Sequence, residues 1–261
     1  MFSRSGFKLK KFISGVNFYA KKGSYGLTGN IYSGLHEFED MAFLLHYLKP
    51  GDIFFDVGAN VGSYTLLASG VCRAKTKAIE PVSATFDLLV KNIELNSLQN
   101  KTQLINAAAG ANEGTLTFTT NEDVTNHVIE APEQSEAHAR VPVVTIDSLI
   151  IDGEPNLIKI DVEGFETEVL NGMTKTLMAK TLRAIIIELN GSGNRYGFDE
   201  SQIHKLLVSK HFTPYHYDPF SRKLSELASY GTHNTIYCRD ITFIDKQLQA
   251  APAFKIMGEF I

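Results

Sequence analysis

The sequence predicts an α/β protein with a doubly wound, mostly parallel sheet and helices on both faces. Between residues 53 and 109, apolar runs rich in β-forming residues alternate with stretches of helical period, and the alternation resumes between residues 156 and 210. Such alternation is typical of strand–helix–strand units in a parallel sheet. A glycine-rich turn at residues 58–62 follows the first apolar run and leads into a helix. These three observations together indicate the fold class.

The first half of the chain supplies the opening strand–helix units. Residues 37–48 carry apolar side chains at helical spacing, and the sequence Lys49-Pro50-Gly51-Asp52 then ends that helix. Residues 53–57 form a short apolar run bounded by turn residues, which is typical of a buried strand. The other elements expected here are strands at residues 75–80 and 103–109 and helices at residues 63–69 and 82–96.

The middle of the chain departs from this alternation. Residues 114–120 and 140–146 alternate apolar and polar side chains in the manner of strands. Residues 121–139 between them are polar and weakly patterned. Because inserted loops of this length are usually functional or mobile, we expect a mobile lid over the pocket here.

The alternation then resumes and closes with two strands. Asp199 is placed to cap a helix at residues 199–210. Residues 212–217 and 232–239 look like closing strands joined directly, which would make one strand antiparallel. The remaining elements expected are strands at residues 156–162 and 183–189 and a helix at residues 166–179.

Composition excludes several classes of protein. The 261 residues carry 25 Lys and Arg against 29 Asp and Glu, and 44% are hydrophobic, so a disordered chain is excluded. Two distant cysteines, Cys72 and Cys238, exclude a disulfide scaffold. No run of 18 apolar residues occurs, so no membrane span is predicted. The net charge of −4 argues against nucleic acid as a partner.

The amino-terminal segment is basic. Six Lys and Arg residues precede the first acid, Glu37, so we expect a basic arm at residues 1–36 before a main domain at residues 37–261. The segment lacks the apolar core of a signal peptide, and we therefore expect a cytoplasmic protein. The arm could be a solvated terminus that packs as a short helix. It could instead contact an anionic substrate or a membrane surface.

The glycine turn predicts a ligand site. Its pattern is Gly58-x-x-x-Gly62, with Asp56 at the preceding strand end, and it differs from the G-x-G-x-x-G of dinucleotide sites. A carboxylate at this position suits a ligand with a cationic amine, and S-adenosylmethionine is such a ligand. Glu80 ends the next strand, where it could accept hydrogen bonds from both ribose hydroxyls of that ligand or of NAD.

Two later strands also end in acidic residues. Asp161 and Glu163 follow the strand at residues 156–162, and Glu188 and Asn190 follow the strand at residues 183–189. The carboxyl ends of parallel strands line the ligand crevice of an open α/β sheet. These side chains should therefore face the same crevice as the glycine turn.

The sequence resembles the FkbM-type family of S-adenosylmethionine-dependent methyltransferases. The resemblance rests on PGDIFFDVGANVGSYTLLAS, AIEPVSATFDLLVKNIELN, VPVVTIDSLI, IKIDVEGFETEVLNGM and AIIIELN, and it extends from about residue 37 to residue 239. It implies a Rossmann-like class I methyltransferase fold, with a seven-stranded sheet whose last strand is antiparallel. It also implies O-methylation of hydroxyl or carboxyl groups, often on sugars or secondary metabolites, so a small-molecule or glycan acceptor is expected.

The resemblance also implies roles for individual residues. It places Glu80 at the ribose and Ala107 and Ala108 near the adenine, while Tyr64 and Thr65 open the helix where the methionyl carboxylate could bind. Asp161 would lie beside the cofactor. The methionine moiety would be surrounded by Asp56, Gly58, Asn60 and Gly62.

Methylation of a sugar hydroxyl needs a general base or a metal. Asp161 is the favoured base because it ends the central strand, and the other candidates are Glu163, Glu188, His233 and His127. Asp161, Glu188 and Asn190 could alternatively form an oxygen-ligand site for Mg²⁺.

Other functions are left open by the same residues. A Rossmann-like module that binds a metabolite or nucleotide without catalysis would share the fold. A dehydrogenase would share Glu80, but the phosphate-binding fingerprint is missing. A base-modifying amino-methyltransferase would show an Asp/Asn-Pro-Pro-aromatic turn where this chain has Asp161-Val162-Glu163-Gly164.

Overall fold

The computed structural model describes residues 7–21, 25–119, 128–129 and 138–261. His127 and most of the expected loop at residues 121–139 lie outside the described residues. The lid prediction is therefore not tested here. Among the described residues, the helices are too short or too polar to cross a bilayer.

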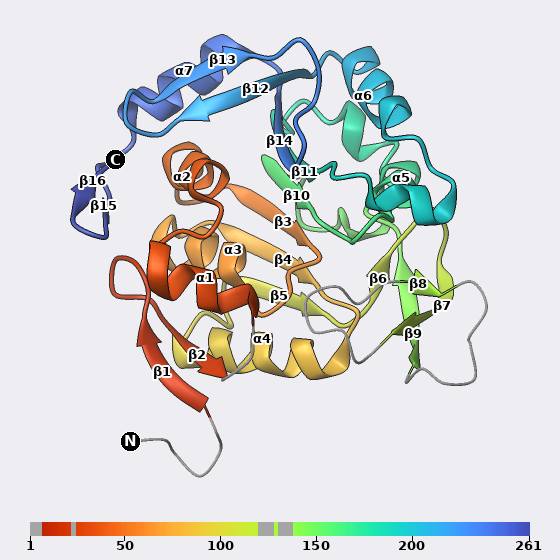
Figure 1. The fold of residues 1–261 in the computed structure, drawn as a ribbon, viewed down its shortest axis with the longest axis horizontal. Helices are drawn as coiled ribbons and strands as arrows, with labels where there is room; N and C mark the ends of the chain where they lie inside the picture. The colour runs from red at the N-terminus through yellow and green to blue at the C-terminus, as the bar shows by residue number, and fades with distance from the viewer. Residues whose placement is uncertain (1–6, 22–24, 120–127, 130–137) are drawn as a thin grey trace.

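An eight-stranded sheet forms the centre of the molecule (Figure 1). Its strand order is β13-β12-β14-β11-β10-β3-β4-β5. Strands β3, β4, β5, β10 and β11 pair in parallel, whereas β14 is antiparallel to both β11 and β12. The expected doubly wound sheet with a reversed closing strand is therefore confirmed. The strands are β3 (Ile53–Val57), β4 (Lys75–Ile79), β5 (Thr102–Ile105), β10 (Leu157–Ile160), β11 (Ala184–Glu188), β12 (Thr213–Asp218), β13 (Lys223–Glu226) and β14 (Asn234–Cys238).

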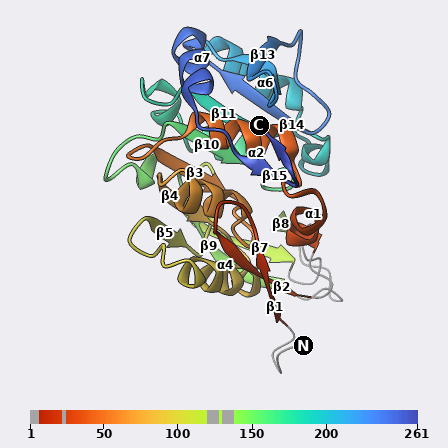
Figure 2. The ribbon, with the colours of Figure 1, turned by 90° about the vertical axis from the view of Figure 1, so that its left-hand side faces the viewer.

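The central strands are mostly apolar because both faces of the sheet are covered. Phe54 is fully buried in the core beneath α2 (Phe38–Tyr47) and α7 (Ile241–Ala250). Phe55 is fully buried on the other face, beneath α5 (Glu166–Asn171) and α6 (Glu200–Ser209). Helix α4 (Ser83–Leu95) packs by Leu88, Leu89 and Ile93 in a third cluster that includes Ala78 of β4. Figures 1 and 2 show the helices on both sides of the sheet.

Two expectations about the closing strands are corrected. The sheet has eight strands instead of seven, because β13 lies between the two closing strands in the sequence and pairs antiparallel with β12. The expected direct connection between those strands is therefore wrong. The cap of α6 is confirmed, since the Asp199 carboxylate accepts a hydrogen bond of 2.9 Å from Ser201 N.

The expected strand at residues 103–109 is divided between two sheets. β5 ends at Ile105, and β6 (Ala108–Ala109) joins a second sheet of order β6-β9-β7-β8. The Asn106 side chain lies at the division, where its amide donates to the carbonyl oxygens of Glu80 and Pro81. The other strands of this sheet are β7 (Gly114–Thr119), β8 (Val128–Ile129) and β9 (His138–Val144), so part of the expected 121–139 loop is strand.

Two expected helices are also subdivided. The helix after the glycine turn consists of α3 (Ser63–Thr65) and a π-helical segment (Leu66–Val71). Helix α5 ends at Asn171, and the chain continues into a 3₁₀ turn (Thr176–Met178). The Asp147 carboxylate accepts hydrogen bonds from the backbone of Lys175 and Thr176 and so starts this separate turn.

The described part of the basic arm packs against the main domain. β1 (Phe7–Lys11) and β2 (Asn17–Lys21) form an antiparallel hairpin, and α1 (Tyr25–Ser33) follows. Phe18 is fully buried. Asn92 of α4 accepts a hydrogen bond from Tyr19 N of β2, and Asn96, which caps the end of α4, accepts one from Asn17 N. This part of the arm is thus built into the fold.

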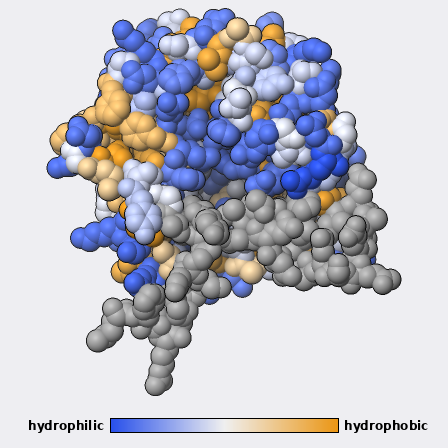
Figure 3. All heavy atoms as spheres, viewed as in Figure 1, coloured by the Kyte–Doolittle hydropathy of each residue, from blue (hydrophilic) through white to orange (hydrophobic). Residues whose placement is uncertain are grey.

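The carboxyl terminus adds a small hairpin, β15 (Lys255–Ile256) and β16 (Glu259–Phe260). Arg222 fixes it by donating to the carbonyl oxygens of Ala251, Pro252 and Ile261. The face shown in Figure 3 is largely hydrophilic, with apolar side chains gathered on the left near this hairpin.

Candidate functional site

A cavity of about 310 Å³ opens at the carboxyl ends of β3, β4, β10 and β11. The segments that line it are the turn after β3, the end of β4 with residues 81–82, β6, and the loop between β10 and α5. The residues before and within α2 supply another wall. The cavity therefore lies where an open α/β sheet normally binds its ligand.

The turn after β3 brings main chain to the cavity. Gly58 has φ +81° and lies so close to the Asp161 carbonyl that a Cβ at this position would overlap it. Glycine is therefore required at this position by both conformation and space. Ile79 O accepts hydrogen bonds from the amides of Gly58 (3.0 Å) and Ala59 (2.9 Å) and ties the turn to β4.

Asp56 lines the cavity from the carboxyl end of β3 and is 1% exposed. The Thr65 hydroxyl donates to its Oδ2 at 2.6 Å. Burial raises the pKa of Asp56 to about 6, although the nearby Lys159 charge and the Thr65 hydrogen bond act against this. Thr65 is outside the cavity lining, and its observed contact holds the Asp56 carboxylate in place.

Glu80 lines the cavity from the end of β4, and its carboxylate accepts hydrogen bonds from Asn60 N and Val82 N, both 2.9 Å. Burial raises the pKa of Glu80 to about 7, against the effect of these two hydrogen bonds. Ala107 and Ala108 form an apolar wall of the same cavity. Gly62 is outside the lining and has φ +96° where the chain enters α3.

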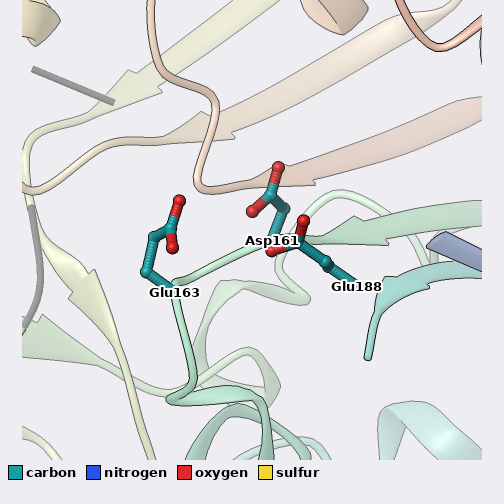
Figure 4. A group of neighbouring side chains, drawn as sticks. All are labelled: Asp161, Glu163 and Glu188. Carbon is teal, nitrogen blue, oxygen red and sulfur yellow. The ribbon is translucent and has the colours of Figure 1, made fainter. Parts of the chain in front are cut away.

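Three carboxyl groups meet beyond the ends of β10 and β11. One oxygen from each of Asp161, Glu163 and Glu188 lies within 4.8 Å of the others, and Figure 4 shows the three side chains close together. Burial, followed by the charges of Asp161 and Glu163, raises the pKa of Glu188 to about 9. Burial and the Asp161 charge raise the pKa of Glu163 to about 7. The cluster can therefore hold or accept protons near neutral pH.

A buried lysine supports this cluster. Lys159 is 3% exposed and its ammonium donates to Asp161 Oδ2 at 2.6 Å. It also lies 4.8 Å from the centroid of the Tyr64 ring. Burial alone would lower the pKa of Lys159, but the carboxylates of Asp161, Glu37 and Asp56 outweigh burial and raise it. Lys159 is therefore a fixed positive charge.

The structure brings most of the predicted residues together and leaves a few apart. His233 is exposed and outside the cavity lining, and His127 is outside the described residues. The predicted site residues that line the cavity are Asp56, Gly58, Asn60, Tyr64, Glu80, Ala107, Ala108, Asp161, Glu163 and Glu188.

The cavity is also lined by Lys159, Glu37 and His36, which are not among the site residues predicted from the sequence. A lysine in the apolar run Leu157–Ile160 was a usable signal, because a lysine is rarely buried without a partner. Glu37 gave no such signal, because it precedes a helix far away in the sequence. Its carboxylate accepts a 2.7 Å hydrogen bond from Asn234 of β14, a contact that only the fold creates.

The donor set fits S-adenosylmethionine. A carboxylate at the end of β4 suits a ribose, the alanines of β6 suit an adenine, and Asp56 offers negative charge beside the glycine turn. The donor set for Mg²⁺ fits poorly. Asn190 is exposed, outside the lining, and accepts a hydrogen bond from Ser192 N, while Lys159 already supplies a cation to Asp161. The predicted Asp161–Glu188–Asn190 metal set is not assembled among the described residues.

Comparison with known proteins identifies one family model, described as a methyltransferase FkbM domain, which matches residues 56–215. Hexuronic acid methyltransferase AglP of Haloferax volcanii is 29% identical over 167 residues, which cover 63% of this chain. The match spans 64% of that protein, just under two thirds of its length. Methyltransferase sdnD of Sordaria araneosa is 25% identical over 209 residues, covering 67% of this chain and 79% of that protein.

A solved structure was also matched. It is the tRNA (uracil-54, C5)-methyltransferase of Pyrococcus abyssi, in complex with S-adenosyl-L-homocysteine. The TM-score is 0.47 at 10% identity, and the match covers 89% of this chain and 44% of that chain.

Proposed function

Because the chain belongs to the FkbM family of S-adenosylmethionine-dependent methyltransferases, we propose that it methylates an oxygen atom of a small molecule or glycan. The observation that carries this proposal is the cavity itself. It joins the glycine turn and Glu80 on one side to Lys159 and the three-carboxylate cluster on the other.

Cofactor binding is assigned to one side of the cavity. Glu80 accepts hydrogen bonds from the ribose hydroxyls with the lone pairs that Asn60 N and Val82 N leave free. Ala107 and Ala108 pack against the adenine. Asp56 and the turn that contains Gly58 and Asn60 surround the methionine portion. When bound, S-adenosylmethionine supplies a methyl group on a positively charged sulfur.

Proton transfer is assigned to Asp161. Asp161 would accept the proton of the acceptor hydroxyl, while bound S-adenosylmethionine would supply the methyl group to that oxygen and would leave as S-adenosylhomocysteine. The ammonium of Lys159 fixes the orientation of the Asp161 carboxylate by its 2.6 Å hydrogen bond. The protein must also align oxygen, carbon and sulfur, which is a contribution of positioning.

Calorimetry tests the cofactor assignment. We expect wild-type protein to bind S-adenosylmethionine and S-adenosylhomocysteine and to give no comparable heat with NAD. Glu80→Ala should weaken binding of both adenosyl compounds by about 1.5–3 kcal/mol, the range for a hydrogen bond to a charged group.

Binding of NAD alone would contradict the proposal. An unchanged dissociation constant in Glu80→Ala would remove the ribose assignment only. Cofactor binding without turnover of any acceptor would favour the non-catalytic module.

A further inference from the structure

The part of the cavity next to the carboxylate cluster is strongly acidic. Glu37, Asp161, Glu163 and Glu188 all line it. Lys159 is the lysine of the described lining, and its ammonium is already bound to Asp161. Ionised carboxyl groups this close repel one another, and the described lining holds no second lysine or arginine to balance the remaining ones.

A buried hydroxyl at the same place lacks a well-aligned partner. Tyr64 is 4% exposed and lines the cavity, and its hydroxyl has no partner at full hydrogen-bond geometry among the described residues, although burial, the charges of Glu37 and Asp40 and a weak side-chain contact with Glu37 raise its pKa. One oxygen of Glu188 is likewise buried without a well-aligned partner in the described part of the chain, and its weak contact is with Asp161, another carboxyl group. Buried polar atoms are normally paired, so both atoms indicate a polar ligand in this part of the cavity.

Among the described lining residues, Lys159 is the lysine or arginine, and His36 is the histidine, that could face an anionic ligand. Arg195 is exposed and outside the described lining, although its charge reaches Glu163. A carboxylate on the acceptor would therefore find no compensating charge beside Asp161, and it would hold Glu163 and Glu188 in their protonated forms, whereas a cationic group would offset the repulsion that raises the pKa of these two residues.

We infer that the acceptor carries a cationic amino group near the methylated oxygen, bound by Glu163 and Glu188 with the Tyr64 hydroxyl completing its polar surroundings. This inference rests on the proposed function, which supplies the methyl transfer. It assigns the substrate class as an amino sugar or a related amino alcohol. The relative from Haloferax volcanii is named for a hexuronic acid, so the two proteins would differ in the charge of their acceptors.

Three methyl glycosides test the inference. Methyl α-D-glucopyranoside is neutral, its 2-amino-2-deoxy analogue is cationic, and the corresponding uronic acid is anionic at pH 7. Each is titrated into the full chain saturated with S-adenosylhomocysteine. We expect the amino glycoside to bind about tenfold tighter than the neutral one, which is the effect of one charge-assisted hydrogen bond. The uronic acid should bind more weakly than the neutral glycoside.

Matched variants then assign the preference to the cluster. Glu163→Gln and Glu188→Gln should each reduce the preference for the amino glycoside, and Tyr64→Phe should weaken its binding severalfold. Glu168→Gln is the control, because Glu168 is on α5 outside the cavity lining and bonds to Asn171. Unchanged affinity for S-adenosylhomocysteine shows that each variant is folded.

Equal binding of the three glycosides, weak or strong, overturns the inference, and so does tighter binding of the uronic acid. A preference for the amino glycoside that survives both glutamate substitutions also overturns it. In these cases intact binding of S-adenosylhomocysteine leaves the proposed function standing. If the wild-type chain fails to bind S-adenosylhomocysteine, the proposed function fails and this inference fails with it.

Discussion

Lys159 and Asp161 show how a single pair of residues organises the site. Lys159 lies in β10 and Asp161 directly follows it, and their side chains meet at 2.6 Å beside the Tyr64 ring. A lysine that is 3% exposed needs a counter-charge, because an unpaired buried charge is strongly unfavourable. The pair therefore fixes the position of a carboxylate at the centre of the cavity.

Replacing Asp161 tests its role in proton transfer. Asp161→Asn keeps the shape but removes the proton acceptor, so turnover should fall by roughly 10²–10⁴. Affinity for S-adenosylhomocysteine should change little, because Glu80 and the glycine turn are untouched. Methyl transfer to the glycoside that binds most tightly is measured by mass spectrometry. Wild-type turnover in this variant would contradict the assignment and leave Glu163, Glu188, His233 and His127 as the remaining predicted bases.

At the scale of elements, Asn92 links three segments that support the cofactor side of the cavity. It is fully buried on α4, where its Oδ1 accepts from Tyr19 N of β2 at 2.8 Å. Its Nδ2 donates to Val61 O in the glycine turn at 2.9 Å. Asn96, one turn later, bonds to the backbone of Asn17 in β2, and among the described residues its side chain makes no hydrogen bond to the glycine turn. Asn92 therefore both anchors the hairpin and supports the glycine turn, whereas Asn96 only anchors the hairpin.

These contacts predict different outcomes for two similar variants. Asn92→Ala should destabilise the fold by about 1–3 kcal/mol, because it leaves a buried amide and a buried carbonyl without partners. It should also weaken binding of S-adenosylhomocysteine. Asn96→Ala should destabilise the fold but leave that affinity near the wild-type value. Denaturant unfolding and calorimetry on the same samples measure both. Equal loss of affinity in the two variants would show that hairpin anchoring alone controls the turn.

At the scale of the whole molecule, the fold concentrates buried carboxyl groups at one edge of the sheet. Burial raises the pKa of Asp56 to about 6 and of Glu80 and Glu166 to about 7. Burial and neighbouring carboxylates raise the pKa of Glu188 to about 9. In the unfolded chain these groups titrate near their ordinary values, close to pH 4. The folded chain therefore binds more protons than the unfolded chain between about pH 4 and pH 9.

The sign of the pH dependence follows from this difference. Stability falls with rising pH wherever the folded state binds more protons, so Tm of the free protein should decrease between pH 5.5 and pH 8.5. For a chain of this size, each kcal/mol lost lowers Tm by roughly 2–4 °C. Glu188→Gln should reduce the slope, and Glu168→Gln should not. Thermal unfolding by circular dichroism measures it, and a Tm that rises over this range would contradict the assigned burial.

The sequence alone determined the order of the parallel strands with their connecting helices, and it located the glycine turn with the acids that flank it. Short apolar runs located the parallel strands because their residues are buried on both faces. Asp56, Gly58 and Glu80 were predictable because strand ends and tight turns carry local signals. The additional strand β13, with the sequence Lys-Leu-Ser-Glu, was not predictable, since an exposed edge strand needs little apolar pattern. The break at Asn106 depended on hydrogen bonds to residues 80 and 81.

Only the tertiary structure decided which charged groups share the acceptor side of the cavity. Glu37 reaches it from the start of α2 and is held by Asn234, which is 197 residues away in the sequence. Lys159 has the place of a core residue in its strand, and its role is visible only once Tyr64 and Asp161 surround its ammonium. A charged residue at a strand end can be recognised from the local sequence. The net charge of the cavity cannot, because it depends on residues that are distant in the sequence and that only the fold brings together. That net charge, four carboxylates with one lysine already paired, is the physical basis for the inferred cationic acceptor.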